Sequence, residues 1–281
     1  MKFAIDHDYH IHSHLSICSD DPEQSNERIL KYAEDNGFRK ICLTDHFWDE
    51  TLPARCGFYN KQGFEHIKKA LPLPQSENVQ FLFGCETEMD KDFNVGVSEK
   101  LYDKFDFIIV PTTHLHFNAF VMEKVLCEPE YRAYLWVKRF EKLLEKDMPF
   151  HKMGVAHLTC SLMLAGKWEE GERPGEKAGE SKYLSVLRLI DDKTYRELFA
   201  KAAKKGIGIE LNIYPFENMG ADERAEVLRP YRAAKEMGCK FYLGSDAHKP
   251  AELDAAIPRF SEIIDALGLT EADKFRFGEK T

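Results

Sequence analysis

Long apolar runs are absent from this sequence of 281 residues. No stretch approaches the roughly 18 consecutive apolar residues of a membrane-spanning helix, so we expect no membrane segment. The opening residues MKFAIDHDYHIHSH lack the apolar core of a secretory signal, and we expect none. Positive charge is also in short supply, because 39 Lys and Arg face 48 Asp and Glu, for a net charge of −9. Such an acidic chain is a poor match for the phosphate backbone of nucleic acids.

The Cys-x-x-Cys spacing and the glycine-rich dinucleotide-binding motif are missing too. The seven cysteines are scattered, odd in number and never spaced Cys-x-x-Cys, which argues for a reduced, cytoplasmic protein. No Gly-x-Gly-x-x-Gly follows the first apolar segment, so a dinucleotide-binding domain is not supported. No Pro/Ser-rich linker divides the chain, and we predict one domain over residues 1–281.

Short apolar segments alternate with helical patterns along the chain. The predicted strands are 3–8, 40–44, 79–83, 107–110, 154–156, 208–211 and 241–243. The predicted helices are 23–36, 64–70, 130–146, 183–205, 221–237 and 251–267. The strand segments do not alternate with polar residues, as expected for strands buried on both faces. About seven such units in series predict an α/β fold in which parallel strands close into a barrel inside a layer of helices.

Two segments, 47–63 and 166–182, are predicted to be inserted loops. The second is charged and rich in glycine. We expect it to be a plain surface loop, and a lid over a site is the alternative.

Histidine and acidic residues gather where the predicted strands end. In chain order these residues are His10 and His12, Asp45 and His46, Glu86, His114 and His116, His157, Glu210 and Asn212, and Asp246 and His248. In barrels this rim carries the active site. Residues two apart on a strand share a face, so one cation can be bound by His10 and His12 together. Imidazole nitrogens mixed with carboxylate oxygens suit Zn, Mn or Fe, and the sequence therefore predicts a metal centre at the rim.

The ordered set HIHS…CSDD…LTDH…GCE…TTH…AHL…ELN…GSDAH resembles the PHP (polymerase and histidinol phosphatase) superfamily, over about 8–250. The resemblance implies a distorted (β/α)7 barrel that holds three divalent ions, variously Zn, Mn or Fe. The ligands that it implies here are His10, His12, Asp20, His46, Glu86, His114, His157, Asp246 and His248. Glu86 would bridge two ions, and His10, His12 and Asp246 would complete one of those sites.

Three of these assignments have alternatives. Asp20 is preferred over Asp21, because Asp21 directly precedes Pro22 at the expected start of a helix and suits an N-cap. His114 is preferred over His116, because it follows directly on the apolar segment FIIV and two threonines. Asp45 either supports a ligand or caps a turn.

A rim of this kind predicts attack on phosphorus by a metal-bound hydroxide, with the other ions holding the phosphoryl oxygens and the leaving alkoxide. We predict Glu86, Asp246 and His248 as the catalytic residues. The general acid is left open, with His248 or a neighbouring acid as candidates. Arg55 and Arg173 are the first candidates to hold the substrate phosphate, since guanidinium binds phosphate through two nitrogens.

The leading functional prediction is a metal-dependent phosphatase that acts on a small anionic phosphomonoester, with histidinol phosphate as one candidate. A nuclease or phosphodiesterase of the same superfamily, or a nucleotide phosphatase, is the first alternative. The acidic composition leaves nucleic acid only as a short substrate. Hydrolysis of C–N bonds, as in amidohydrolases, is a weaker alternative because no predicted strand ends in lysine. A silent metal-binding domain is the non-catalytic alternative.

Overall fold

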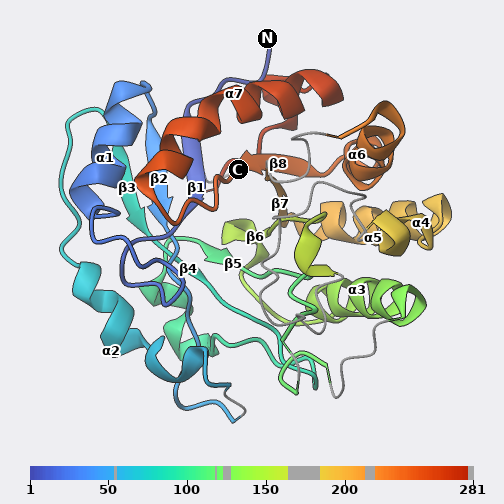
Figure 1. Ribbon diagram of the computed structural model, residues 1–281, viewed down its shortest axis with the longest axis horizontal. Helices are drawn as coiled ribbons and strands as arrows, with labels where there is room; N and C mark the ends of the chain where they lie inside the picture. The colour runs from blue at the N-terminus through green and yellow to red at the C-terminus, as the bar shows by residue number, and fades with distance from the viewer. Residues whose placement is uncertain (54–55, 118, 123–127, 164–183, 213–218, 278–281) are drawn as a thin grey trace.

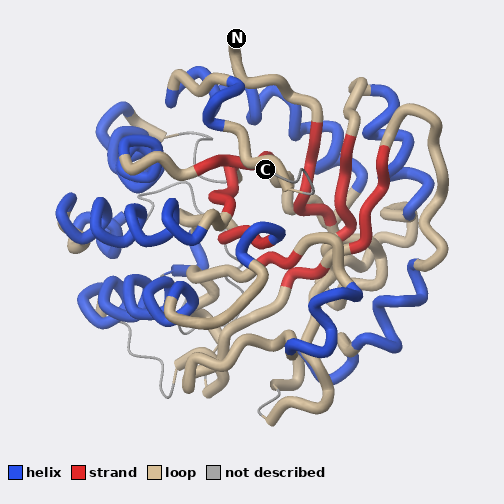
Figure 2. The backbone as a smooth tube through the Cα atoms, turned by 180° about the vertical axis from the view of Figure 1, so that it is seen from behind, coloured by secondary structure: helices blue, strands red, loops and turns tan. Residues whose placement is uncertain are grey.

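The computed structural model describes residues 1–53, 56–117, 119–122, 128–163, 184–212 and 219–277. In this part of the chain, short parallel strands lie inside a ring of helices (Figure 1, with the reverse side in Figure 2). The strands are β1 (His7–Ile11), β2 (Lys40–Leu43), β3 (Gln80–Phe83), β4 (Cys85–Glu86), β5 (Ile108–Ile109), β6 (Met153–Val155), β7 (Gly208–Leu211) and β8 (Lys240–Leu243).

The α-helices are α1 (Asn26–Asp35), α2 (Phe64–Ile67), α3 (Pro129–Leu144), α4 (Leu184–Arg188), α5 (Asp192–Lys205), α6 (Ala221–Glu236) and α7 (Pro250–Leu267). Short 3-10 helices lie at η1 (Tyr59–Lys61), η2 (Lys68–Ala70), η3 (Glu99–Lys104), η4 (Phe150–Lys152), η5 (Ser161–Met163) and η6 (Glu271–Asp273). None of the helices in the described ranges is both long and apolar enough to cross a membrane.

The strands form two parallel sheets that meet along two seams. One sheet has the order β1-β2-β3 and the other β4-β5-β6-β7-β8. At the first seam the chain passes from one sheet to the other at Gly84, whose N–H donates to Leu43 O, while the next N–H donates to Phe107 O. At the second seam the N–H of Asp246 donates to His10 O at 2.7 Å. The predicted barrel of seven β/α units is thus confirmed, with its third strand bent at Gly84 into β3 and β4.

The barrel interior is packed with side chains. A compact group of buried residues fills it: Tyr9, Cys42, Leu82, Phe107, Ile109, Ala156, Tyr242, Phe275 and Phe277. The last two come from the C-terminal segment, which returns to the strands through a hydrogen bond from Phe275 N to Phe241 O. A larger apolar cluster packs the helices against the outside of the strands.

The observed boundaries differ from the predicted ones at the start of the chain. β1 begins at His7, four residues later than predicted, because Lys2 and Phe3 pair instead with the segment after α7. His10 therefore lies inside the strand. α1 begins at Asn26, since the Ser25 side chain caps it by accepting a hydrogen bond from the Arg28 N–H.

One predicted helix is also broken in two. Residues 183–205 contain α4 and α5, and the break occurs where Asp191 accepts the N–H of Thr194 and starts a new helix. The inserted loop 166–182 lies outside the described residues, so its interpretation as a surface loop or a lid stays a prediction.

The bend at Gly84 should not tolerate a side chain. A Cβ there would lie 2.5 Å from Phe107 O and 2.7 Å from Cys42 Sγ. Gly84→Ala should therefore lower the free energy of unfolding by about 1–3 kcal/mol, as overpacking does. Gly57→Ala, where a Cβ meets nothing within 4 Å, is the matched control and should change it little. Equal denaturant stability of the two variants would contradict the described seam.

Candidate metal centre

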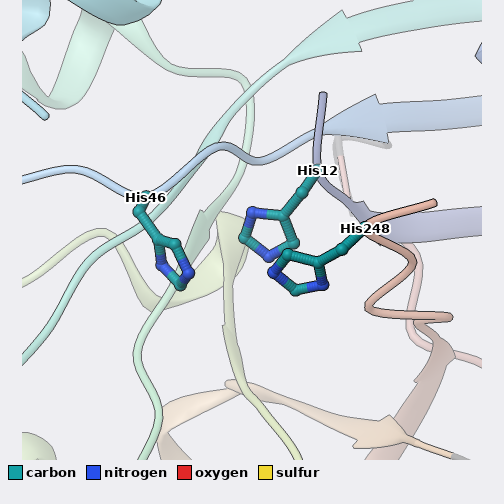
Figure 3. A group of neighbouring side chains, drawn as sticks. All are labelled: His12, His46 and His248. Carbon is teal, nitrogen blue, oxygen red and sulfur yellow. The ribbon is translucent and has the colours of Figure 1, made fainter. Parts of the chain in front are cut away.

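Eight of the nine predicted ligands converge at the carboxyl ends of the strands. They form three overlapping groups whose ligand atoms lie within 4.8 Å of one another: His12, His46 and His248; His10, His12, Glu86 and Asp246; and Glu86, His114 and His157. Figure 3 shows the first group, in which the His12 and His248 rings stack with their centroids 4.1 Å apart. The eight residues come from six different strand ends on the barrel rim, so only the closed fold brings them together.

Glu86, at the end of β4, lies in the middle of these groups. Its Oε2 is 3.4 Å from His12 Nε2 and 3.6 Å from His10 Nε2. Its Oε1 faces the other way and lies 3.2 Å from His157 Nε2. Two carboxylate oxygens directed at two sets of imidazoles are the geometry of a bridging ligand.

Most of the surrounding histidines are fixed in one orientation through Nδ1. The Nδ1 atom of His10 lies 2.6 Å from Glu210 Oε1, and that of His114 lies 2.8 Å from Glu88 Oε2. The Nδ1 of His248 donates to the carbonyl of Asp246 at 2.8 Å. A hydrogen bond at Nδ1 leaves Nε2 as the nitrogen with a free lone pair, and such outer partners orient metal-binding histidines.

His12 is held in the same way through a hydroxyl. Its Nδ1 lies 2.8 Å from Ser16 Oγ, which donates in turn to Asp45 Oδ1 at 2.7 Å. Asp45 also accepts hydrogen bonds from the N–H and hydroxyl of Ser13. The contacts of Asp45 fit both of its predicted roles: it holds the hydroxyl behind the His12 ring, and it accepts the N–H of Ser13 at the start of a turn.

Two buried carboxylates that surround the centre were not assigned a role from the sequence. Glu88 binds Arg139 of α3 with one oxygen and His114 with the other, and both its partners are buried. Glu210 of β7 pairs with His10 and accepts the backbone N–H of His157 at 2.7 Å. The spacing of Glu88 from Glu86 is a signal that could have identified it, because residues two apart in extended chain face the same side.

The backbone is strained at two of the candidate ligands. His157 has φ of 28° and Asp246 has φ of 55°, in a region that side chains other than glycine rarely adopt. Such strain costs about 1–3 kcal/mol per residue and persists where the surroundings enforce it, often at functional sites. Here it places both side chains toward Glu86.

Burial and charge act against each other on the acid–base groups of the centre. Burial lowers the pKa of His10, but the carboxylates of Glu210, Asp246 and Glu86 outweigh it and raise that pKa well above its usual value. Burial and the neighbouring His12 lower the pKa of His248 to about 3, so its ring stays neutral. Burial raises the pKa of Glu86, yet His46 and His10 reverse this and hold it well below the usual range.

The donor set fits divalent metal ions. Among the described residues seven carboxylates are buried, namely Asp8, Asp45, Asp49, Glu86, Glu88, Asp90 and Glu210. The buried cationic side chains of the same ranges are Arg132, Arg139 and Lys274. Buried carboxylates need compensating charge, and cations held by the imidazoles would supply it. One buried nitrogen, His46 Nδ1, lies 2.9 Å from Glu86 Oε2 without hydrogen-bond geometry, as a nitrogen directed at a shared ion would.

The remaining predicted site residues lie elsewhere. The structure does not bring Asp20 into the groups: its carboxylate is 85% exposed and faces Lys249 Nζ at 3.7 Å. Asp21, its alternative, accepts the N–H of Glu23 in a turn. His116 packs against Phe117 and stays out of the groups, whereas His114 joins them. Arg55 and Arg173 lie outside the described residues.

Comparisons with known proteins show the family and the fold of this chain. The PHP domain family model matches residues 8–214. A solved histidinol phosphate phosphatase from Lactococcus lactis, complexed with Zn, L-histidinol and phosphate, is 15% identical, with a TM-score of 0.62, 96% of this chain covered and 98% of that one. A putative histidinol phosphatase from Listeria monocytogenes is 14% identical, with a TM-score of 0.49 and coverage of 88% and 97%. A search of curated proteins found no match.

A substitution at Glu210 tests how far the outer partners support the centre, because Glu210 contacts Nδ1 of His10 and leaves its Nε2 unchanged. Glu210→Gln removes the charge beside His10 Nδ1 at nearly constant shape, and loss of such an outer partner weakens metal affinity about 10- to 100-fold. Zinc titration of the chelated protein by calorimetry measures the change. Glu262→Gln, at an exposed ion pair with Arg224, is the control and should bind zinc as the unmodified protein does. Equal affinities for all three proteins would show that Glu210 has no such role.

Proposed function

Because this chain belongs to the PHP domain family, we propose that it is a metal-dependent phosphatase that hydrolyses a small phosphomonoester. The observation that carries the proposal is the convergence of imidazoles from several strand ends on the two oxygens of Glu86. Three divalent ions, Zn, Mn or Fe, are the cofactors proposed for this centre. Ions held there would lower the pKa of a bound water and neutralise the phosphoryl oxygens of a substrate.

We assign the rim residues to three ion-binding positions. His10, His12 and Asp246 would hold one ion together with Glu86. His114 and His157 would hold a second ion on the other side of Glu86. His46 and His248 would contribute to the third.

Solvent reaches this centre from one side. The side chains of Asp246 and His248 are 17% and 19% exposed, whereas that of Glu86 is 1% exposed. Below the centre, aromatic side chains fill the interior of the barrel. A phosphate ester would therefore meet Asp246 and His248 first, which supports their proposed catalytic role beside Glu86.

Aromatic side chains at the rim favour a substrate that carries a ring. Phe58 contacts the His46 ring with centroids 4.9 Å apart and also packs on Phe117, which in turn contacts His114. Both phenylalanines are only partly buried, whereas Trp48 and Tyr59 of the same region belong to the core. Such rings stack well on planar groups. Histidinol phosphate is therefore the substrate proposed for the first test, with added support from the fold shared with the Lactococcus enzyme.

Two further proposals concern the residues that hold the substrate phosphate and the compartment in which the protein works. Arg55 and Arg173 stay candidates for holding the substrate phosphate through their guanidinium groups. The cytoplasm is the proposed compartment, because the six cysteines in the described ranges are all free thiols.

A phosphate-release assay tests the proposed activity. The protein is supplied with Mn or Zn and offered histidinol phosphate, nucleoside monophosphates, sugar phosphates and an aryl phosphate. A bis-aryl phosphodiester is tested in parallel, and its cleavage is followed by release of the aryl alcohol. We expect phosphate release from monoesters that a chelator abolishes. Glu86→Gln should lower kcat by at least about 100-fold, since loss of a ligand costs no less than loss of an outer partner.

The control for Glu86→Gln is again Glu262→Gln, which should keep full activity. A Glu86→Gln protein that stays active and fully metallated would refute the assignment of Glu86. If the protein prefers the phosphodiester, or releases phosphate only from nucleoside monophosphates, the proposed substrate is wrong. The proposed metal-dependent hydrolysis would still hold. No hydrolysis of any ester by metal-loaded protein would refute the phosphatase proposal.

A further inference from the structure

His12 cannot serve both of the groups in which it stands. Its Nδ1 is engaged by Ser16 Oγ, so Nε2 is its one free nitrogen. That atom lies 3.1 Å from Asp246 Oδ1 and 3.1 Å from His10 Nε2. If Nε2 of His12 binds the ion shared with His10, Glu86 and Asp246, then only His46 and His248 remain for the third ion. Protein zinc sites use at least three protein ligands, so this site lacks one.

Cys18 lies beside His46, one of the two ligands that remain for the third ion. Its Sγ is 3.1 Å from His46 Nε2, while the opposite nitrogen of the same ring faces Glu86. In Figure 3 the His46 ring lies across from the stacked pair of His12 and His248. The edge of the His46 ring that carries Nε2, away from Glu86, therefore borders the position of the third ion. The thiol is exposed, and a metal ion could reach it from solvent.

The loop that carries Cys18 is tied to the loop that carries His248. The Ser19 hydroxyl donates to His248 O at 2.7 Å, and the Ser19 N–H donates to Ser16 O at 2.9 Å. On the other side of Cys18, the Ile17 N–H donates to the side chain of the buried Gln62 at 3.1 Å. Both neighbours of Cys18 are therefore fixed in place, and one of them is fixed to the backbone of a candidate ligand.

We propose that the Cys18 thiolate is the third protein ligand, with His46 and His248, of one divalent ion at this centre. On binding, the thiol proton passes to solvent and the sulfur donates a lone pair to the ion. A thiolate is a soft ligand that suits Zn and Fe better than Mn, so this position would differ from the two nitrogen–oxygen positions beside Glu86. The inference rests on the metal centre of the proposed function and is independent of the substrate.

Cobalt substitution tests the proposal, because a thiolate bound to Co²⁺ gives an intense near-ultraviolet charge-transfer band that nitrogen and oxygen ligands do not give. The chelated full-length protein is titrated with Co²⁺, and bound cobalt is counted by elemental analysis after desalting. We expect the band in the unmodified protein and its loss in Cys18→Ser, together with the loss of one of three bound ions. Cys18→Asp should restore the third ion without the band, and it should shift competition between Zn and Mn toward Mn.

Cys160→Ser is the matched control. Cys160 lies 4.0 Å from Nδ1 of His157, on the side of that ring away from Glu86, so its removal should leave the band intact. A band that survives in Cys18→Ser, or three bound Co²⁺ ions without any band, would overturn the proposal and leave the metal centre standing. Failure of the unmodified, folded protein to bind Co²⁺ would overturn the metal centre and this ligand with it.

Discussion

A buried carboxylate surrounded by imidazoles is the constraint on which the rest of this structure depends. Glu86 is 1% exposed and lies within 3.6 Å of nitrogens from four histidines. A charge at that depth is tolerated only when positive charge is arranged around it. The carboxylates of Glu210, Asp246 and Glu86 raise the pKa of His10 well above its usual value, despite the burial that opposes this. Divalent ions would take over this compensation, and their electrophilic chemistry would then be available at the rim.

Hydrogen bonds to buried carboxylates of the barrel hold the candidate ligands in this arrangement. Glu88, Glu210 and Asp45 each restrain one histidine or the loop that carries it. Arg139 of α3 extends this support into the helical layer, because it pairs with Glu88 inside the core. Positive φ values at His157 and Asp246 show that some of the stability of the fold is given up to direct these side chains. A rim of this kind is organised before any substrate arrives, which is what catalysis by electrostatic stabilisation requires.

The sequence was most informative where strand periodicity and residue type agreed. The rim position of His10, His12 and Glu86 follows from their places at the ends of apolar segments, and the closed barrel needs no further information. Boundaries were predicted less well, since the start of β1 depends on pairing of Lys2 and Phe3 with the distant segment after α7. Pattern alone could not show this, because the pairing is set by tertiary contacts.

Loops limited the prediction of ligands. The family resemblance implies Asp20 as a ligand, yet the turn from Ser16 to Ser19 directs Cys18 to His46 and leaves Asp20 in solvent. No periodicity applies in such a turn, and only the hydrogen bonds of its neighbours determine which side chain faces the rim. Glu88 was missed for a different reason: the residue pattern was present, but its partner Arg139 comes from a distant helix and cannot be paired with it from the sequence.

The central claim is that one carboxylate organises several metal ions, and anomalous X-ray diffraction tests it most directly. Crystals of the metal-loaded protein would be measured on both sides of the absorption edge of the bound metal. We expect three anomalous peaks, two of them in contact with opposite oxygens of Glu86 and the third beside His46 and His248. A single peak, peaks away from Glu86, or a Glu86 carboxylate that contacts no ion would contradict it.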